Sequence, residues 1–143
     1  MNVTHATFTL EREFPVPPAA VFAAYADPAA RRQWFAGDAP DHFLDFRVGG
    51  TERVSAPGET GMLTFTADFR DIVADQRILY SSQLTAGDQL STVTATAIEF
   101  EPTADGTRLV ITEHGMFLPG QEKPEWRQQG TAQQLDALAK LIN

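Results

Sequence analysis

Two ionisable side chains fall on strand faces that are otherwise apolar. In a regular strand Arg12 would lie on the same face as Leu10 and Phe14, and Glu113 on the same face as Ile111. A buried charge needs a partner, so an arginine and a carboxylate brought together inside the fold would form a polar anchor for a ligand. The alternative is that both side chains lie at the rim of the fold or pair for structural reasons alone.

Hydroxyl groups form a second set of candidates. Thr94 and Thr96 alternate with Ile98, so in a regular strand they would share its inner face and, with Tyr80, could orient a ligand by hydrogen bonds. The apolar residues change parity near Ala97, which predicts a β-bulge there. With a bulge, alanines would line the inner face instead, and the sequence leaves both arrangements open.

The segment "DFRVGG" at residues 45–50 combines an acid, a base and paired glycines. A phosphate loop needs glycines that lead into a helix N-terminus, whereas these lead into another predicted strand. Asp45 and Arg47 alternate with the apolar Phe46, so we expect them to face outward or to pair across strands. The glycines then serve a tight turn.

Several kinds of catalytic and metal site are not supported. The chain has no cysteine, and its histidines, at positions 5, 42 and 114, lack the spacing of metal ligands. Glu113 and His114 are neighbours on a predicted strand and so point to opposite faces. No G-x-S-x-G elbow occurs. We therefore predict no catalytic residue, no metal site and no cofactor.

Length and charge restrict the possible partners. The 143 residues suit one domain, 1–143, and the formal net charge is −8, which disfavours nucleic acid and anionic lipid. The N-terminal residues do not resemble a signal peptide, and no apolar run approaches the roughly 20 residues that span a bilayer. We expect a cytoplasmic protein without membrane insertion, either a monomer or a homodimer.

The order of predicted elements is one strand, two short helices, six strands and one long helix. Strands are predicted for residues 7–14, 42–48, 51–57, 61–73, 76–84, 91–102 and 107–117, and helices for residues 19–28, 28–35 and 123–143. Short turns between consecutive strands favour an antiparallel sheet. The last helix carries an apolar stripe that must cover this sheet, and Gly130 within it costs about 1 kcal/mol relative to alanine. The fold class is therefore α+β.

This order and its local motifs resemble the activator-of-Hsp90-ATPase-like branch of the START/Bet v 1 helix-grip superfamily. The matching pieces are Val21-Phe22, Asp27-Pro28 leading to Trp34, "DFRVGG", "GMLTFTADFRDI" before "RILY", "IEFEP" with "GTRLVITEHG", and the terminal "LDALAKLI". The resemblance implies a curved antiparallel β-sheet wrapped around a long C-terminal helix, with a hydrophobic cavity between them. Members bind lipids, hormones or other apolar molecules, and a few are enzymes.

The resemblance also indicates which residues would line such a cavity. Members of this branch often have Gly-Trp in the last helix, where this chain has Gly130-Thr131, which would change the lining or enlarge the cavity. The candidate lining residues are Arg12, Trp34, Phe35, Phe46, Phe65, Phe69, Tyr80, Thr94, Thr96, Glu113, Phe117, Thr131 and Leu135.

The leading hypothesis is non-catalytic binding of a small, mostly apolar, lipid-like or aromatic molecule in this cavity. One alternative is an enzyme of the polyketide cyclase or hydrolase type, with Arg12, Glu113 or Tyr80 as acid–base groups. It requires two of these groups to converge on a reacting atom. The other alternative is a co-chaperone-like regulator that contacts an Hsp90-type ATPase through its surface.

Overall fold

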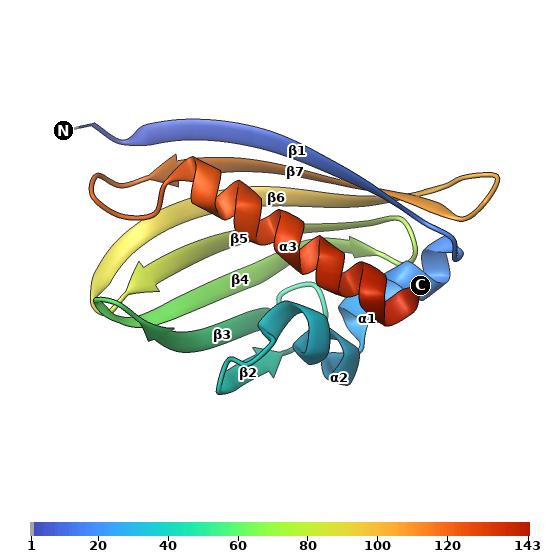
Figure 1. The fold of residues 1–143 in the computed structure, drawn as a ribbon, viewed down its shortest axis with the longest axis horizontal. Coiled ribbons are helices and arrows are strands. Elements are labelled where there is room, and N and C mark those ends of the chain that lie inside the picture. Colours follow the sequence, from blue (N-terminus) through green and yellow to red (C-terminus); the bar gives the residue numbers. More distant parts are fainter. Residues whose placement is uncertain (1) are drawn as a thin grey trace.

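The strands of the chain form one curved antiparallel sheet (Figure 1). The computed structural model describes residues 2–143. Within these residues the sheet has seven strands in the order β1-β7-β6-β5-β4-β3-β2. The strands are β1 (Thr4–Phe14), β2 (Asp41–Leu44), β3 (Thr51–Gly58), β4 (Gly61–Val73), β5 (Arg77–Ala86), β6 (Gln89–Pro102) and β7 (Thr107–Phe117).

The first strand forms one edge of the sheet, beside the last strand. Strand β1 pairs with β7 from Thr4 opposite Phe117 to Phe14 opposite Thr107, while every other pair joins strands that are consecutive in the chain. Short turns connect these consecutive strands, as the antiparallel arrangement permits. The predicted α+β architecture, with a curved sheet, a long C-terminal helix and short helices after the first strand, is confirmed.

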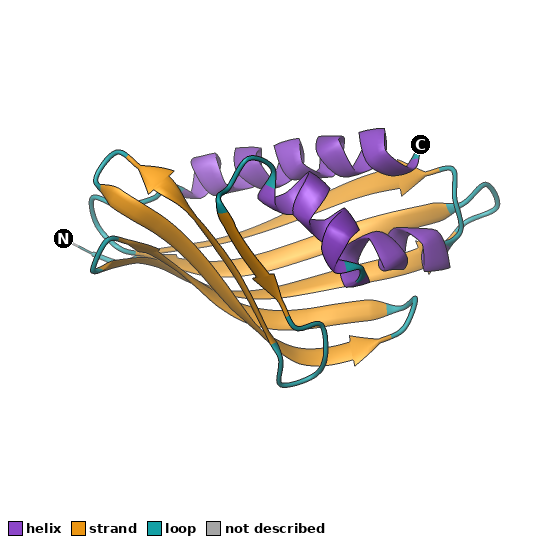
Figure 2. Cartoon of the chain, turned by 90° about the horizontal axis from the view of Figure 1, so that it is seen from below, coloured by secondary structure: helices purple, strands orange, loops and turns teal. Residues whose placement is uncertain are grey.

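The helices all lie against the same face of the sheet (Figure 2). They are α1 (Pro18–Ala26), α2 (Pro28–Arg31), which continues into a π-helical turn (Arg32–Ala36), and α3 (Pro124–Ile142). Each of the three α-helices has a proline in its first turn, where the missing N–H is not needed. Asp27 caps α2, since its carboxylate accepts a hydrogen bond from the backbone N–H of Ala30 at 3.0 Å.

Apolar side chains from the helices and from the inner face of the sheet form the core. Leu135 and Leu138 of α3 are at most 1% exposed, as are Leu109 of β7 and Ile78 of β5. The rest of the buried cluster consists of Phe14, Val21, Phe22, Ala24, Tyr25, Trp34, Phe69, Ile98, Phe100 and Ile111. The end of α3 that lies beside α1 therefore packs tightly on the sheet.

The predicted bulge at Ala97 is wrong. The pairing of β5 with β6 is continuous there, with Tyr80 opposite Thr96 and Leu79 opposite Ala97. The register shifts instead beside Leu84, because Ser91 is an extra residue in β6. Thr94 and Thr96 therefore lie on the inner, buried face together with Ile98, and the apolar alternation changes because this face becomes polar toward the start of β6.

The segment "DFRVGG" is a turn, as predicted, but strand β2 ends at Leu44 rather than at residue 48. The Arg47 guanidinium donates to the Asp45 carboxylate at 2.9 Å on the surface. A side chain at Gly50 would place its Cβ 2.1 Å from the Asp45 carbonyl oxygen, so the turn requires glycine at this position.

Candidate ligand cavity

A cavity of about 210 Å³ lies between α3, the π-helical turn and the sheet. For comparison, an apolar cavity of about 150 Å³ can hold benzene. Its lining consists of Tyr25, Arg31, Trp34, Phe35, Val54, Phe65, Tyr80, Ile98, Ile111, Glu113, Glu122, Trp126, Arg127, Gly130, Thr131, Gln134 and Leu135. The cavity is thus aromatic and aliphatic, with a few polar and charged groups.

Helix α1 and the π-helical turn supply part of the aromatic lining. Tyr25 and Trp34 pack edge to face with ring centroids 4.8 Å apart, and Phe35 packs in the same way against Phe65 of β4 at 5.7 Å. The Trp34 indole N–H donates to the carbonyl oxygen of Ala24 at 2.8 Å, which fixes the ring. The tight packing of these rings on one another holds the cavity wall in place.

One face of α3 forms the wall on the opposite side. Arg127, Gly130, Thr131 and Gln134 follow the i, i+3, i+4, i+7 spacing that places residues on one side of a helix. A Cβ added at Gly130 would meet no atom within 4 Å. The glycine therefore leaves space beside the cavity that an ordinary side chain would occupy.

A buried ion pair supports the aromatic wall. The Arg31 Nε and Nη2 atoms donate to the two carboxylate oxygens of Glu52 at 2.9 and 2.7 Å, and His42 Nε2 lies 3.0 Å from Glu52 Oε2. The Arg31 guanidinium carbon lies 3.6 Å from the centroid of Phe35. Burial raises the pKa of Glu52, but attraction to Arg31 and hydrogen bonding to His42 and Arg31 outweigh it and lower that pKa below its ordinary value.

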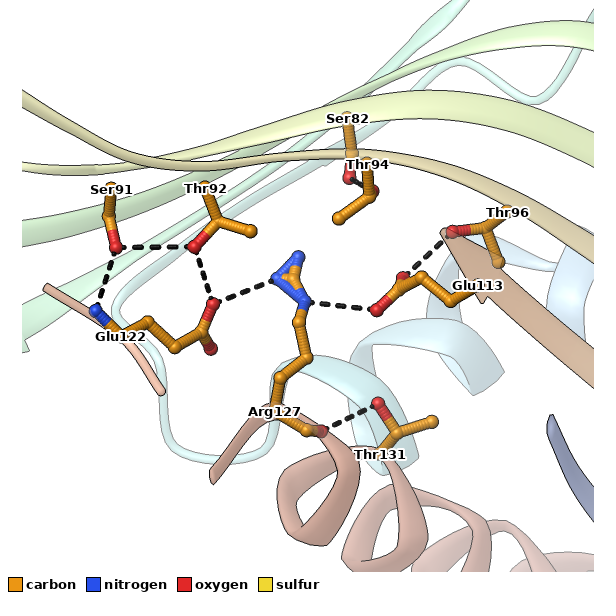
Figure 3. A network of polar contacts seen from close by, with 9 residues as sticks. All are labelled: Ser82, Ser91, Thr92, Thr94, Thr96, Glu113, Glu122, Arg127 and Thr131. Atoms are coloured by element: carbon orange, nitrogen blue, oxygen red, sulfur yellow. Dashed lines mark hydrogen bonds and ion pairs between the residues drawn. The ribbon is translucent and has the colours of Figure 1, made fainter. Parts of the chain in front are cut away.

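A second polar network joins the sheet to the start of α3 (Figure 3). Arg127 Nε donates to Glu113 at 3.1 Å, and Arg127 Nη1 donates to Glu122 at 3.4 Å. The Thr96 hydroxyl donates to the other oxygen of Glu113 at 2.7 Å, and the Thr92 hydroxyl donates to Glu122 at 2.7 Å. The inner threonines of β6 thus support the carboxylates that hold Arg127.

Burial changes the acidity of three cavity residues. It raises the pKa of Glu113, although Arg127 and Thr96 partly offset this effect. It raises the pKa of Tyr80 to about 12, and the Glu113 charge contributes to that rise. Burial also raises the pKa of Tyr25 well above its ordinary value. Both tyrosine hydroxyls therefore remain protonated at neutral pH and can donate hydrogen bonds.

The raised pKa of Glu113 leads to a prediction for Glu113→Gln. Because the folded protein binds this proton more tightly than the unfolded chain, ionisation of Glu113 costs stability as the pH rises from about 4.5, the ordinary value, through the raised folded-state value. The variant lacks this cost. The difference in free energy of unfolding, variant minus wild type, should therefore increase with pH. Urea denaturation from pH 4.5 to pH 8 measures it. A difference that does not change with pH would contradict the prediction.

Seven of the predicted candidates line the cavity. They are Trp34, Phe35, Phe65, Tyr80, Glu113, Thr131 and Leu135. Thr96 lies directly behind Glu113 and hydrogen-bonds to it, and Thr94 lies on the same inner face with its hydroxyl against that of Ser82. These two threonines support the site without contributing to its surface.

Four predicted candidates lie elsewhere. Phe46 and Phe69 pack on each other in the core beside Phe22. Phe117 is buried beneath Gly115, where an added Cβ would come within 2.6 Å of its ring. The side chain of Arg12 is 34% exposed, and its Nη2 atom lies 3.7 Å from Asp136 Oδ1 on the outer side of α3.

Of the two arrangements considered for Arg12 and Glu113, the paired one does not occur. Glu113 lies opposite Phe8 in the sheet, whereas Arg12 lies opposite Leu109. Four residues of strand separate the two positions, about 14 Å at roughly 3.4 Å per residue. Arg127 of α3 is the arginine that pairs with Glu113, at 3.1 Å between Nε and Oε2.

Sequence reasoning missed Tyr25, Arg31, Glu122, Trp126 and Arg127. The signal that could have found two of them is helical spacing. Arg31 is three and four residues before Trp34 and Phe35, and Arg127 is four residues before Thr131, so each shares a helix face with a predicted lining residue. Parity along the strands gave no information about these helical residues.

No group of three or more histidine, aspartate or glutamate side chains in residues 2–143 is arranged to hold a metal ion. In that same part of the chain, no helix combines the length and apolar character needed to cross a membrane.

Comparisons with known proteins place the chain among similar folds. The family model described as activator of Hsp90 ATPase homolog 1-like protein matches residues 15–143. The Mll3558 protein from Rhizobium loti is 42% identical with a TM-score of 0.90, and the match covers 98% of this chain and 99% of that one. An uncharacterised protein from Rhizobium leguminosarum is 38% identical with a TM-score of 0.93, covering 99% and 96% of the two chains.

A more distant structure shares the fold alone. DynU16, described as a protein in the dynemicin biosynthetic locus, is 19% identical with a TM-score of 0.68, and the match covers 94% of this chain and 46% of that one. A search of curated proteins found no match.

Proposed function

The chain belongs to the activator of Hsp90 ATPase homolog 1-like family, and from this premise we propose that it binds a small, mostly apolar molecule in the cavity beneath α3. The observation that supports this most is the open volume of about 210 Å³ inside a ring of aromatic side chains. Protein interiors are otherwise close-packed, with few voids larger than a water molecule. A ligand that fills the volume gains about 25 cal/mol for each Å² of apolar surface that it buries.

A catalytic use of the same cavity has one observation in its favour, since Tyr80 and Glu113 both line it. An acid–base residue works best when its pKa lies near the operating pH, and the pKa of Tyr80 is about 12. Both oxygens of Glu113 already accept hydrogen bonds, from Thr96 and Arg127. Arg12, the third acid–base candidate, is outside the cavity. Binding without chemistry therefore has the better support.

Thermal shift and native mass spectrometry with small aromatic and alicyclic compounds test the proposal. A ligand present at 100 times its Kd should stabilise the protein by about 2.7 kcal/mol, and the midpoint temperature should rise by several degrees in a saturable way. Native mass spectrometry should show one bound molecule per chain. The absence of any saturable shift across compounds from benzene to naphthalene in size would contradict the proposal.

Trp126 lies at the edge of the cavity and provides a further prediction. It lines the cavity although it is 56% exposed, and Lys123 Nζ is 5.2 Å from its ring centroid. Trp126→Ala should weaken ligand binding about fivefold, because it removes apolar contact surface at the edge of the site. It should change the free energy of unfolding by less than about 1 kcal/mol, since the residue is mostly exposed. Titration calorimetry and urea denaturation measure the two effects; a loss of stability without a loss of affinity would show that the indole has only a structural role.

A further inference from the structure

Several hydrogen-bond donors among the cavity residues, including one nitrogen of each arginine and the Tyr25 hydroxyl, make no hydrogen bond to the protein. Arg31 uses Nε and Nη2 for Glu52, and Arg127 uses Nε and Nη1 for Glu113 and Glu122. The side-chain hydrogen bonds of residues 2–143 include none from Arg31 Nη1, Arg127 Nη2 or the Tyr25 hydroxyl. In Figure 3 the third nitrogen of the Arg127 guanidinium points away from both carboxylates.

These donors must touch open space. Every completely enclosed side-chain nitrogen or oxygen in residues 2–143 has a hydrogen-bond partner, so an atom without a partner cannot be completely enclosed. Arg31 and Tyr25 are nevertheless only 4% and 3% exposed, and both line the cavity. Their free N–H and O–H groups therefore face the space that a ligand would fill.

The acceptors around the same space are mostly engaged. Both oxygens of Glu113 accept hydrogen bonds, as do both oxygens of Glu52 behind the wall. The Thr131 hydroxyl donates to the Arg127 carbonyl oxygen on its own helix. The cavity thus offers donors in excess, and a ligand that carries an acceptor would satisfy them.

The charges around the cavity favour a neutral ligand. Arg31 is neutralised by Glu52, and Arg127 lies between Glu113 and Glu122, so these five groups carry a formal excess of one negative charge. An anion would have to enter beside Glu113 and Glu122. A cation would face two guanidinium groups, and Arg31 already occupies the aromatic faces that could hold a cation. A neutral acceptor meets neither obstacle.

We propose that the ligand is a neutral carbonyl compound, a ketone or an aldehyde on one small ring, whose oxygen accepts hydrogen bonds from Arg31 Nη1 and the Tyr25 hydroxyl. The ring lies among Phe35, Phe65 and Tyr80, and the volume of about 210 Å³ limits the molecule to one ring with a short substituent. This inference rests on the proposed binding function and specifies the ligand of that same cavity.

Matched pairs of compounds separate this inference from the binding function itself. Acetophenone and α-methylstyrene have nearly the same shape, but the first has a C=O group where the second has C=CH₂. Cyclohexanone and methylenecyclohexane form a corresponding alicyclic pair. We expect each ketone to bind the wild-type protein about tenfold more tightly than its hydrocarbon partner, measured by NMR titration at neutral pH. Benzoate and benzylamine, an anion and a cation of similar size, should bind at least tenfold more weakly than acetophenone.

Tyr25→Phe tests the assignment of the donor. The variant keeps the ring that packs on Trp34 and Phe100 and loses only a hydroxyl without a partner, so the fold should be unaffected. Its affinity for acetophenone should fall about fivefold, and its affinity for α-methylstyrene should stay within twofold of the wild type. Equal affinity for ketone and hydrocarbon, or tighter binding of benzoate, would overturn the inference and leave the binding function standing. Failure of all these compounds to bind would overturn both.

Discussion

Arg31→Met is expected to lower the free energy of unfolding by about 3–5 kcal/mol, the usual cost of removing one partner of a buried ion pair. Glu52 is 1% exposed and receives two hydrogen bonds from Arg31, so the substitution leaves its carboxylate with His42 alone. Attraction to Arg31 is the largest of the contacts that lower the pKa of Glu52. Without it, the Glu52 carboxyl should take up a proton in the variant. Urea denaturation at pH 7 measures the loss.

An exposed ion pair provides the control. Arg47 pairs with Asp45 at 2.9 Å, close to the distance in the buried pair, but their side chains are 67% and 37% exposed. Arg47→Met should cost less than about 1 kcal/mol, because water screens this pair. The double variant Arg31→Met/Glu52→Leu should recover much of the loss, since it leaves no buried charge. If Arg31→Met costs no more than Arg47→Met, the buried pair does not support the cavity wall.

Gly130→Phe is expected to abolish ligand binding, with at least a 100-fold loss of affinity, and to leave the protein at least as stable as the wild type. A Cβ at this position meets no atom within 4 Å, and the residue shares a helix face with three other lining residues. A phenyl ring would therefore enter the cavity and occupy the space of the ligand. Replacement of glycine in a helix interior also improves helix propensity.

The smaller substitution at the same position is the matched control. Gly130→Ala should raise the free energy of unfolding by about 1 kcal/mol and should leave ligand affinity within a few-fold of the wild type, because a methyl group fills little of the cavity. Titration calorimetry with acetophenone and thermal denaturation measure both properties in parallel. Retained binding in Gly130→Phe would show that the ligand does not use the space beneath α3.

The element order and the inner faces of regular strands were predictable from the sequence. A strand repeats every two residues, so alternation indicates an inner face for Phe65 and Glu113, and both residues line the cavity. Near Ala97 the same reasoning left two arrangements open, because threonines continue the inner face of β6 where the apolar alternation ends. A polar inner face and a bulge produce the same change in the apolar pattern.

The partners of the charged residues could not be predicted from the sequence alone. Arg31 and Glu52 are 21 residues apart, and Glu113 and Arg127 are 14 apart, in different elements. Their contacts depend on the register of the sheet and on where α2 and α3 lie across it. Alternation indicates a face but not a position along the strand. It therefore left open a contact between Arg12 and Glu113 that the register of the sheet prevents.

The central claim is that the space beneath α3 receives a ligand, and methyl NMR during titration with acetophenone tests it most directly. The methyl groups of Val54, Ile98, Ile111 and Leu135 line the cavity, whereas Val93 and Met116 lie on the other face of the sheet. We predict saturable shift changes at the first set, little change at the second, and no saturable change in Gly130→Phe. Shifts confined to Val93 and Met116, or no saturable shift at any methyl group, would contradict the account.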